Sequence, residues 1–235
     1  MARNKCSRPS ESKAYAFKSR YCALWTALLN IAQTGGADPN GSIVSCCDGD
    51  RIVVQTKEDR CLELLGVPAK SIVRTRNVDV HVSFRQTLQY AVDGPFVHGS
   101  NVKVTYIEGA GGDKKCKVLE TWHYDYSPKL RAHPIYHVQL TGDHLLKGPT
   151  TREYHLPYRT PDLDRIPRVP CAPMDLPAVA ALLVYDHFPD RLEQLDEPEW
   201  TRVALNIPSF PGDHFREQGW KKSSVARAWY PKTTG

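Results

Sequence analysis

The chain has 235 residues, of which 41% are hydrophobic and 24% are charged. This composition can supply a sizeable core and excludes a wholly disordered chain, a collagen and a low-complexity scaffold. No stretch approaches the roughly 20 apolar residues of a membrane span, and the first residues lack the apolar segment of a signal peptide. We therefore expect a cytoplasmic protein that does not bind membranes and has one large domain or two small ones.

The positive charge is concentrated at the two ends of the chain. The formal net charge is +5, but residues 1–20 carry six basic residues against one acidic residue, and residues 216–235 carry five against one. Lysine and arginine supply most of the sequence-independent affinity for nucleic acid. Two basic ends on a mildly acidic body therefore predict contact with phosphate or with an acidic partner surface. The alternative interpretation is terminal charge that serves solubility alone.

The seven cysteines show no CxxC pair and no regular framework. Cys46 and Cys47 are adjacent, and neighbouring strand residues point to opposite faces, so a disulfide between them is unfavourable. An odd count without a framework is typical of a reducing compartment. We interpret most of the cysteines as small buried hydrophobic residues rather than as reactive thiols or metal ligands.

The first segments change from a helical to a strand pattern. Residues 13–33 predict an amphipathic helix that Ser12 caps, because apolar residues recur at steps of three and four. Residues 42–55 predict a hairpin whose turn contains Gly49, which can adopt a positive φ. A short helix is expected over residues 58–66. The apolar residues of the first helix are Phe17, Tyr21, Leu24, Leu28 and Ile31.

The middle of the chain is rich in predicted strands. Alternating apolar residues indicate strands over residues 71–84, 101–108, 116–126 and 133–140. Consecutive strands with short connections predict an antiparallel meander.

A second buried helix is expected over residues 175–188, with Asp175 as its cap and Pro177 in its first turn. Residues 145–174 predict an extended connection. The fold class is therefore α+β, with an antiparallel sheet packed by the N-terminal amphipathic helix and a C-terminal helix. We assign residues 1–195 to a single domain and residues 196–235 to a basic, aromatic-rich extension.

The hairpin over residues 119–140 carries the candidate catalytic residues. Alternation places His123 and Asp125 on one face of the outgoing strand and His133 and His137 on one face of the returning strand. A tight turn would pair Asp125 with His133 and place His123 opposite Ile135. Three imidazoles and a carboxylate could transfer protons or bind a divalent metal, although no cofactor is required. The alternative is a set of hydrogen-bonded residues on a solvated sheet face.

Asp79 and His81 could join this cluster from a neighbouring strand. The segment Arg76 to His81 also has the residue order of the R-N-x-x-x-H motif of HEPN ribonucleases. In that family the motif lies on a helix, whereas the alternating valines here predict a strand. We therefore do not predict a HEPN site.

Aromatic and basic residues alternate near the C-terminus. Such a mixture can stack on unpaired bases while the cations hold phosphates, although core packing and a protein interface are alternatives. The candidate nucleic-acid-binding residues are Lys221, Lys222, Arg227, Trp229 and Lys232.

Residues 100–190 resemble a loosely defined group of uncharacterised bacterial proteins. The resemblance is carried by an aromatic-Asp-Tyr strand, a His-Pro-x-x-His strand and an Arg-x-Pro element, here Tyr124–Tyr126, His133–His137, Arg165–Pro167 and Arg168–Pro170. Members of such groups are often encoded near phage-defence genes. The resemblance thus implies a bacterial accessory protein of immunity but no established catalytic residues.

We predict a non-catalytic binding or assembly component that contacts nucleic acid or a larger protein complex. The alternative is a small metal- or histidine-dependent nuclease or toxin that uses the cluster at residues 123–137. A purely structural subunit that contacts only protein is a third interpretation.

Overall fold

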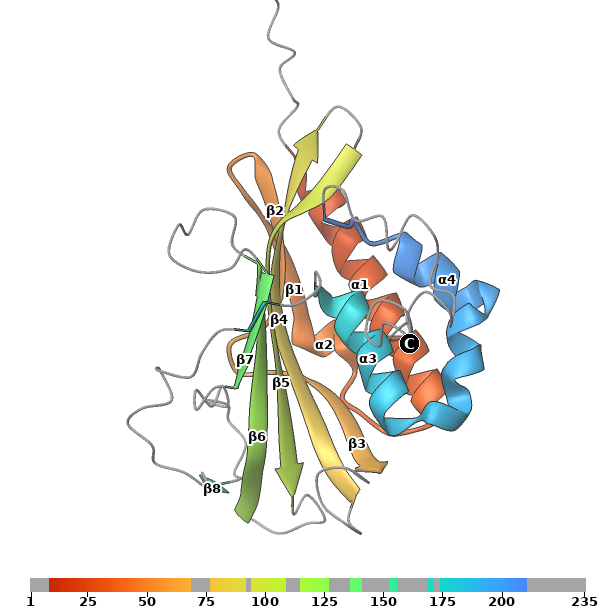
Figure 1. The fold of residues 1–235 in the computed structure, drawn as a ribbon. Coiled ribbons are helices and arrows are strands. Elements are labelled where there is room, and N and C mark those ends of the chain that lie inside the picture. Colours follow the sequence, from red (N-terminus) through yellow and green to blue (C-terminus); the bar gives the residue numbers. More distant parts are fainter. Residues whose placement is uncertain are drawn as a thin grey trace, which may run out of the picture.

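A computed structural model describes residues 9–68, 77–91, 94–108, 115–126, 136–140, 153–155, 169–170 and 174–210 (Figure 1). The helices are α1 (Glu11–Ala32), α2 (Pro39–Ser42), α3 (Leu176–His187), the 3₁₀ helix η2 (Pro189–Asp196) and α4 (Pro198–Leu205). The strands are β1 (Ile43–Asp48), β2 (Arg51–Thr56), β3 (Leu62–Pro68), β4 (Asn77–Ala91), β5 (Gly94–Glu108), β6 (Lys115–Tyr126), β7 (Tyr136–Leu140), β8 (Glu153–His155) and β9 (Val169–Pro170).

The strands of the described residues form one sheet in the order β1-β2-β4-β5-β6-β7-β9. Strand β8 pairs in parallel with β6, and every other pairing is antiparallel. Strands β2 and β3 follow one another along the same edge of β4, because β5 occupies the other edge. The succession β4 to β7 confirms the predicted antiparallel meander, and the α+β fold class is confirmed with it.

The helices cover one face of this sheet (Figure 1). Helix α1 begins two residues earlier than predicted, because the Ser10 side chain accepts a hydrogen bond from the Lys13 amide. Its predicted apolar residues are all buried, and the ring of Tyr21 stacks on Phe84 of β4 with 5.3 Å between centroids. Helix α3 has the predicted cap, since the Asp175 carboxylate accepts from the Ala178 amide.

The last helices belong to the same core. Segment 198–210, which the sequence places in the C-terminal extension, packs against α1 and the sheet. The amide of Val97 donates to the carbonyl of Ser209 at 2.8 Å, and the ring of Phe210 meets Tyr126 edge-on. The buried residues of this segment are Trp200, Val203, Ala204, Ile207 and Phe210.

One predicted element is wrong. Residues 58–66 were expected to form a short helix, but residues 62–68 form β3, which pairs with β4. Leu62, Leu64 and Val67 are fully buried. Glutamate and leucine favour helices locally, but the free edge of β4 offers backbone hydrogen bonds and a place to bury these three side chains. Tertiary pairing therefore overrides local propensity.

In the part of the chain that the structure describes, no helix has both the length and the apolar character needed to cross a bilayer.

A buried histidine links α3 to the sheet and predicts acid sensitivity. The Nδ1–H of His187 donates to the carbonyl of Pro68 at 3.3 Å, so Nε2 accepts from the Tyr106 hydroxyl at 3.0 Å. Burial lowers the pKa of His187 below its ordinary value of 6.5. As the pH falls below about 6.5, the unfolded chain takes up a proton before the folded chain does, and stability is lost.

We expect the free energy of unfolding of the wild type to fall between pH 7 and pH 5 more steeply than that of the His187→Gln variant. Urea denaturation at several pH values measures both slopes. Equal slopes for the two proteins would show that His187 does not cause the acid sensitivity.

Candidate functional site

The face of the sheet opposite the helices carries polar and charged side chains, among them the predicted residues His123 and Asp125. Residues in register across neighbouring strands share a face. The side chains that define this face, called the polar face below, come from Ser83 and Arg85 of β4, Asn101 and Lys103 of β5, and His123 and Asp125 of β6.

His123 and Asp125 lie on a strand and share the polar face, as predicted. Their partners on the returning strand differ from the prediction. Asp125 lies opposite His137 and His123 lies opposite Gln139, whereas the expected partners were His133 and Ile135.

The pairing register is thus shifted by four residues relative to the prediction. An even shift keeps each side chain on its face. The backbone of His137 accordingly lies opposite Asp125, and the Gln139 amide donates to His123 Nδ1 at 3.4 Å. His133 lies outside the described residues, so the structure brings two of the predicted residues together and places a third beside them by register.

The predicted nucleic-acid-binding residues of the tail lie outside the described residues. They are Lys221, Lys222, Arg227, Trp229 and Lys232.

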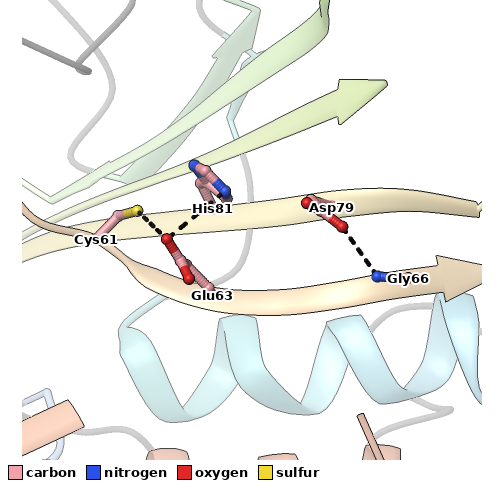
Figure 2. Close-up of polar contacts among 5 residues, drawn as sticks. All are labelled: Cys61, Glu63, Gly66, Asp79 and His81. Carbon is pink, nitrogen blue, oxygen red and sulfur yellow. Dashed lines mark hydrogen bonds and ion pairs between the residues drawn. The ribbon is translucent and has the colours of Figure 1, made fainter. Parts of the chain in front are cut away.

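Asp79 and His81 do not join His123, because β5 lies between β4 and β6. Asp79 instead supports the backbone of β3. Its Oδ1 accepts from the Gly66 amide at 2.9 Å, beside the bulge between Leu64 and Val67 (Figure 2). Gly66 has a φ of +66°, which favours glycine.

His81 belongs to a second cluster, with Cys61 and Glu63 (Figure 2). The Cys61 thiol donates to Glu63 Oε1 at 3.8 Å, and His81 Nε2 lies 4.0 Å from the same oxygen. Burial, together with the Glu63 carboxylate, raises the pKa of Cys61 to about 12. The thiol therefore keeps its proton at neutral pH in this arrangement.

A pocket of about 330 Å³ opens beside this cluster, where the chain passes from β2 to β3. Cys61 and His81 contribute to its wall. Its charged lining consists of four cations and one carboxylate: Lys57, Arg60, Arg85, Lys103 and Glu58.

Among the described residues, one of the four pocket cations has an acidic partner within ion-pair distance. Arg60 lies 3.9 Å from the exposed Asp59 carboxylate. Lys57, Arg85 and Lys103 form no ion pair with any residue of the described segments. A concave site with excess positive charge attracts anions, since its low-dielectric wall focuses the field.

The sequence interpretation missed the pocket and the cysteine cluster. Arg85 and Lys103 each stand between two buried residues of their strand, so the alternation of buried and less buried residues already indicated their face. Cys61 was expected to be a small buried residue, and it is buried. Its position beside Glu63 and His81 follows only from the pairing of β3 with β4.

Comparison of the chain with protein-family models, curated proteins and solved structures finds no match.

Proposed function

We propose that the protein is a non-catalytic nucleic-acid-binding component that holds backbone phosphates at the polar face. The observation that supports this function is the pocket between β2 and β3, with four cations and one carboxylate in its lining. Phosphates are anions that accept several hydrogen bonds, and lysine and arginine are their main protein partners.

The position of the cations favours an extended ligand over a single small anion. Arg85 and Lys103 lie on neighbouring strands, and Asn101 pairs with Arg85 across the same face. Asp125 lies beside Asn101, one strand further along. A strand of nucleic acid could therefore place one phosphate in the pocket and run along polar side chains beyond it. The basic tail around Lys221 would add further phosphate contacts.

The pocket cations should set the salt dependence of binding. We expect the double variant Arg85→Ala/Lys103→Ala to bind a short labelled single-stranded RNA several-fold more weakly than the wild type. Each lost phosphate contact lowers the slope of log K against log salt by roughly 0.7, so the slope should fall by roughly 1 to 2. Fluorescence anisotropy between low and moderate salt measures both quantities, in buffer that contains chelator.

The matched control removes the same charge from the helix layer. Lys18→Ala/Arg202→Ala neutralises one cation on α1 and one on α4, and its salt slope should equal that of the wild type. An equal loss of RNA affinity and of salt slope in the two double variants would show that binding depends on net charge alone. A wild type that binds no RNA or DNA at low salt would contradict the proposal. The contribution of the tail to RNA affinity is measured with a variant that neutralises its four basic residues, Lys221, Lys222, Arg227 and Lys232.

The nuclease alternative has one structural feature in its favour. Asp125 and His123 share the polar face, and His123 accepts a hydrogen bond from Gln139, so a carboxylate and an imidazole occupy one end of that face. Metal-dependent cleavage of the RNA that disappears in His123→Ala with folding intact would replace the binding proposal by this one. The association with bacterial defence rests on the sequence resemblance alone and stays a prediction.

A further inference from the structure

Three side chains with different ligand atoms converge at the start of β3. Cys61 directly precedes β3 and Glu63 is its second residue, so both point to the same side of the chain. Glu63 lies opposite His81 in the β3–β4 register. The thiol sulfur, a carboxylate oxygen and an imidazole nitrogen all lie within 4.8 Å of one another. Strand pairing thus fixes the three groups in position without a ligand.

The spacing of these atoms suits a small tetrahedral ion. Ligand atoms around tetrahedral zinc stand about 3.5 Å apart, because zinc lies about 2.0 to 2.3 Å from each of them. Here the sulfur lies 3.8 Å and the imidazole nitrogen 4.0 Å from Glu63 Oε1. The sulfur and the imidazole nitrogen lie within 4.8 Å of one another. Side-chain rotations that move each ligand atom by up to about 1 Å would therefore close the shell, with no change in strand pairing.

The ligand types narrow the choice of metal. Magnesium and calcium prefer oxygen ligands only, whereas thiolate and imidazole together favour zinc and its softer neighbours. Cys61 is 7% exposed and His81 is 4% exposed, so a bound ion would be largely shielded from water. Three protein ligands are the number found in zinc sites that keep one position for an exogenous ligand.

The fourth position would face the cationic pocket, because Cys61 and His81 both line that pocket. We propose that Cys61, Glu63 and His81 bind one zinc ion, and that an anionic oxygen ligand such as phosphate completes its coordination from the pocket. The sulfur–zinc bond replaces the S–H bond of Cys61, and the proton is released to solvent. Arg85 and Lys103 line the same pocket and favour a negatively charged ligand there. The zinc site does not rest on nucleic-acid binding and stands if that function fails.

The test uses the full chain, stripped of metal with a chelator and dialysed. Calorimetric titration with zinc chloride should show one equivalent bound. Cobalt(II) added to the same protein should give the visible bands of a tetrahedral site and the near-ultraviolet charge-transfer band of a thiolate ligand. The cobalt spectrum needs no variant, so it tests the site even where a substitution impairs folding.

Cys61→Ser and His81→Ala should each bind zinc at least about 100-fold more weakly, because loss of an outer-sphere partner alone costs roughly 10- to 100-fold. Cys46→Ser is the matched cysteine control, since Cys46 is exposed on β1. His98→Ala is the histidine control, since His98 lies on β5 and is not one of the three proposed ligands. Both controls should bind zinc as the wild type does, and circular dichroism verifies the fold of each variant.

The position of the fourth ligand is tested with inorganic phosphate. Phosphate added to the cobalt-loaded wild type should shift the visible bands, and Arg85→Ala/Lys103→Ala should require several-fold more phosphate for the same shift. Unchanged bands would overturn the open position. A wild type without the thiolate band, or zinc affinity that Cys46→Ser reduces as much as Cys61→Ser, would overturn the metal site. Because RNA binding is measured in chelator and zinc binding without RNA, the two proposals fail separately.

Discussion

Replacing Trp200 by alanine is expected to destabilise the protein by about 3–5 kcal/mol, the range for removal of a large aromatic side chain from a core. Trp200 lies on α4 and is 2% exposed. Its indole Nε1 has no hydrogen-bond partner among the described residues, so the expected loss comes from packing. Urea denaturation followed by far-ultraviolet circular dichroism measures the free energy of unfolding.

Leu205→Ala is the matched control on the same helix, because Leu205 is 49% exposed. Its effect should lie within about 0.5 kcal/mol of zero, as for most surface substitutions. Trp200→Phe keeps much of the ring and should cost less than the alanine variant. Residues 196–235 were predicted to be an extension of the domain. If Trp200→Ala leaves stability unchanged, that segment is dispensable for the core and the packing of α4 contributes nothing.

Sequence patterns predicted several elements whose burial is one-sided, and they also predicted α3, most of whose residues are buried. Helix α1 shows its buried face at steps of three and four, and the meander strands show theirs at every second residue. The hairpin of β1 and β2 was predictable from Gly49, which has a φ of +63° at the turn. These patterns depend only on which face meets the core, so they can be read without knowledge of the partners.

The candidate site depends on strand register and on contacts between distant residues, which such patterns do not predict. Alternation placed His123 and Asp125 on one face of the sheet. The odd or even position of a residue in its strand does not, however, determine the register in which β7 pairs with β6. The register was therefore wrong by four residues while the face was right. The residue pair Glu63 and His81 is separated by 18 positions in sequence, and only the pairing of β3 with β4 joins it. A segment predicted as helix could not reveal that contact.

Replacing Gly36 by alanine should also have a large effect, because the chain after α1 lies directly against β3. The Leu65 amide donates to the Gly35 carbonyl at 2.9 Å, and the Thr34 hydroxyl donates to the Leu65 carbonyl. A Cβ at Gly36 would overlap the backbone carbonyl oxygen of Glu63 and lie 3.0 Å from a methyl group of Leu29. Backbone cannot rotate away as a side chain can.

We expect Gly36→Ala to lower the free energy of unfolding by about 1–3 kcal/mol, the usual cost of overpacking. Gly35→Ala is the neighbouring control, since its Cβ would meet only the Leu65 side chain at an ordinary 3.7 Å. Equal stabilities of the two variants in urea would show that the contact with β3 relaxes without cost.

The same substitution couples the fold to the proposed zinc site. Overlap at the Glu63 carbonyl must displace β3 relative to α1, and Glu63 is one of the three proposed ligands. We expect the folded Gly36→Ala protein to bind zinc roughly 10- to 100-fold more weakly, as when support of a ligand is lost. Gly35→Ala should retain wild-type affinity. Reduced stability with unchanged zinc affinity would show that β3 moves as a rigid pair with β4, because the register of Glu63 and His81 would then survive the displacement.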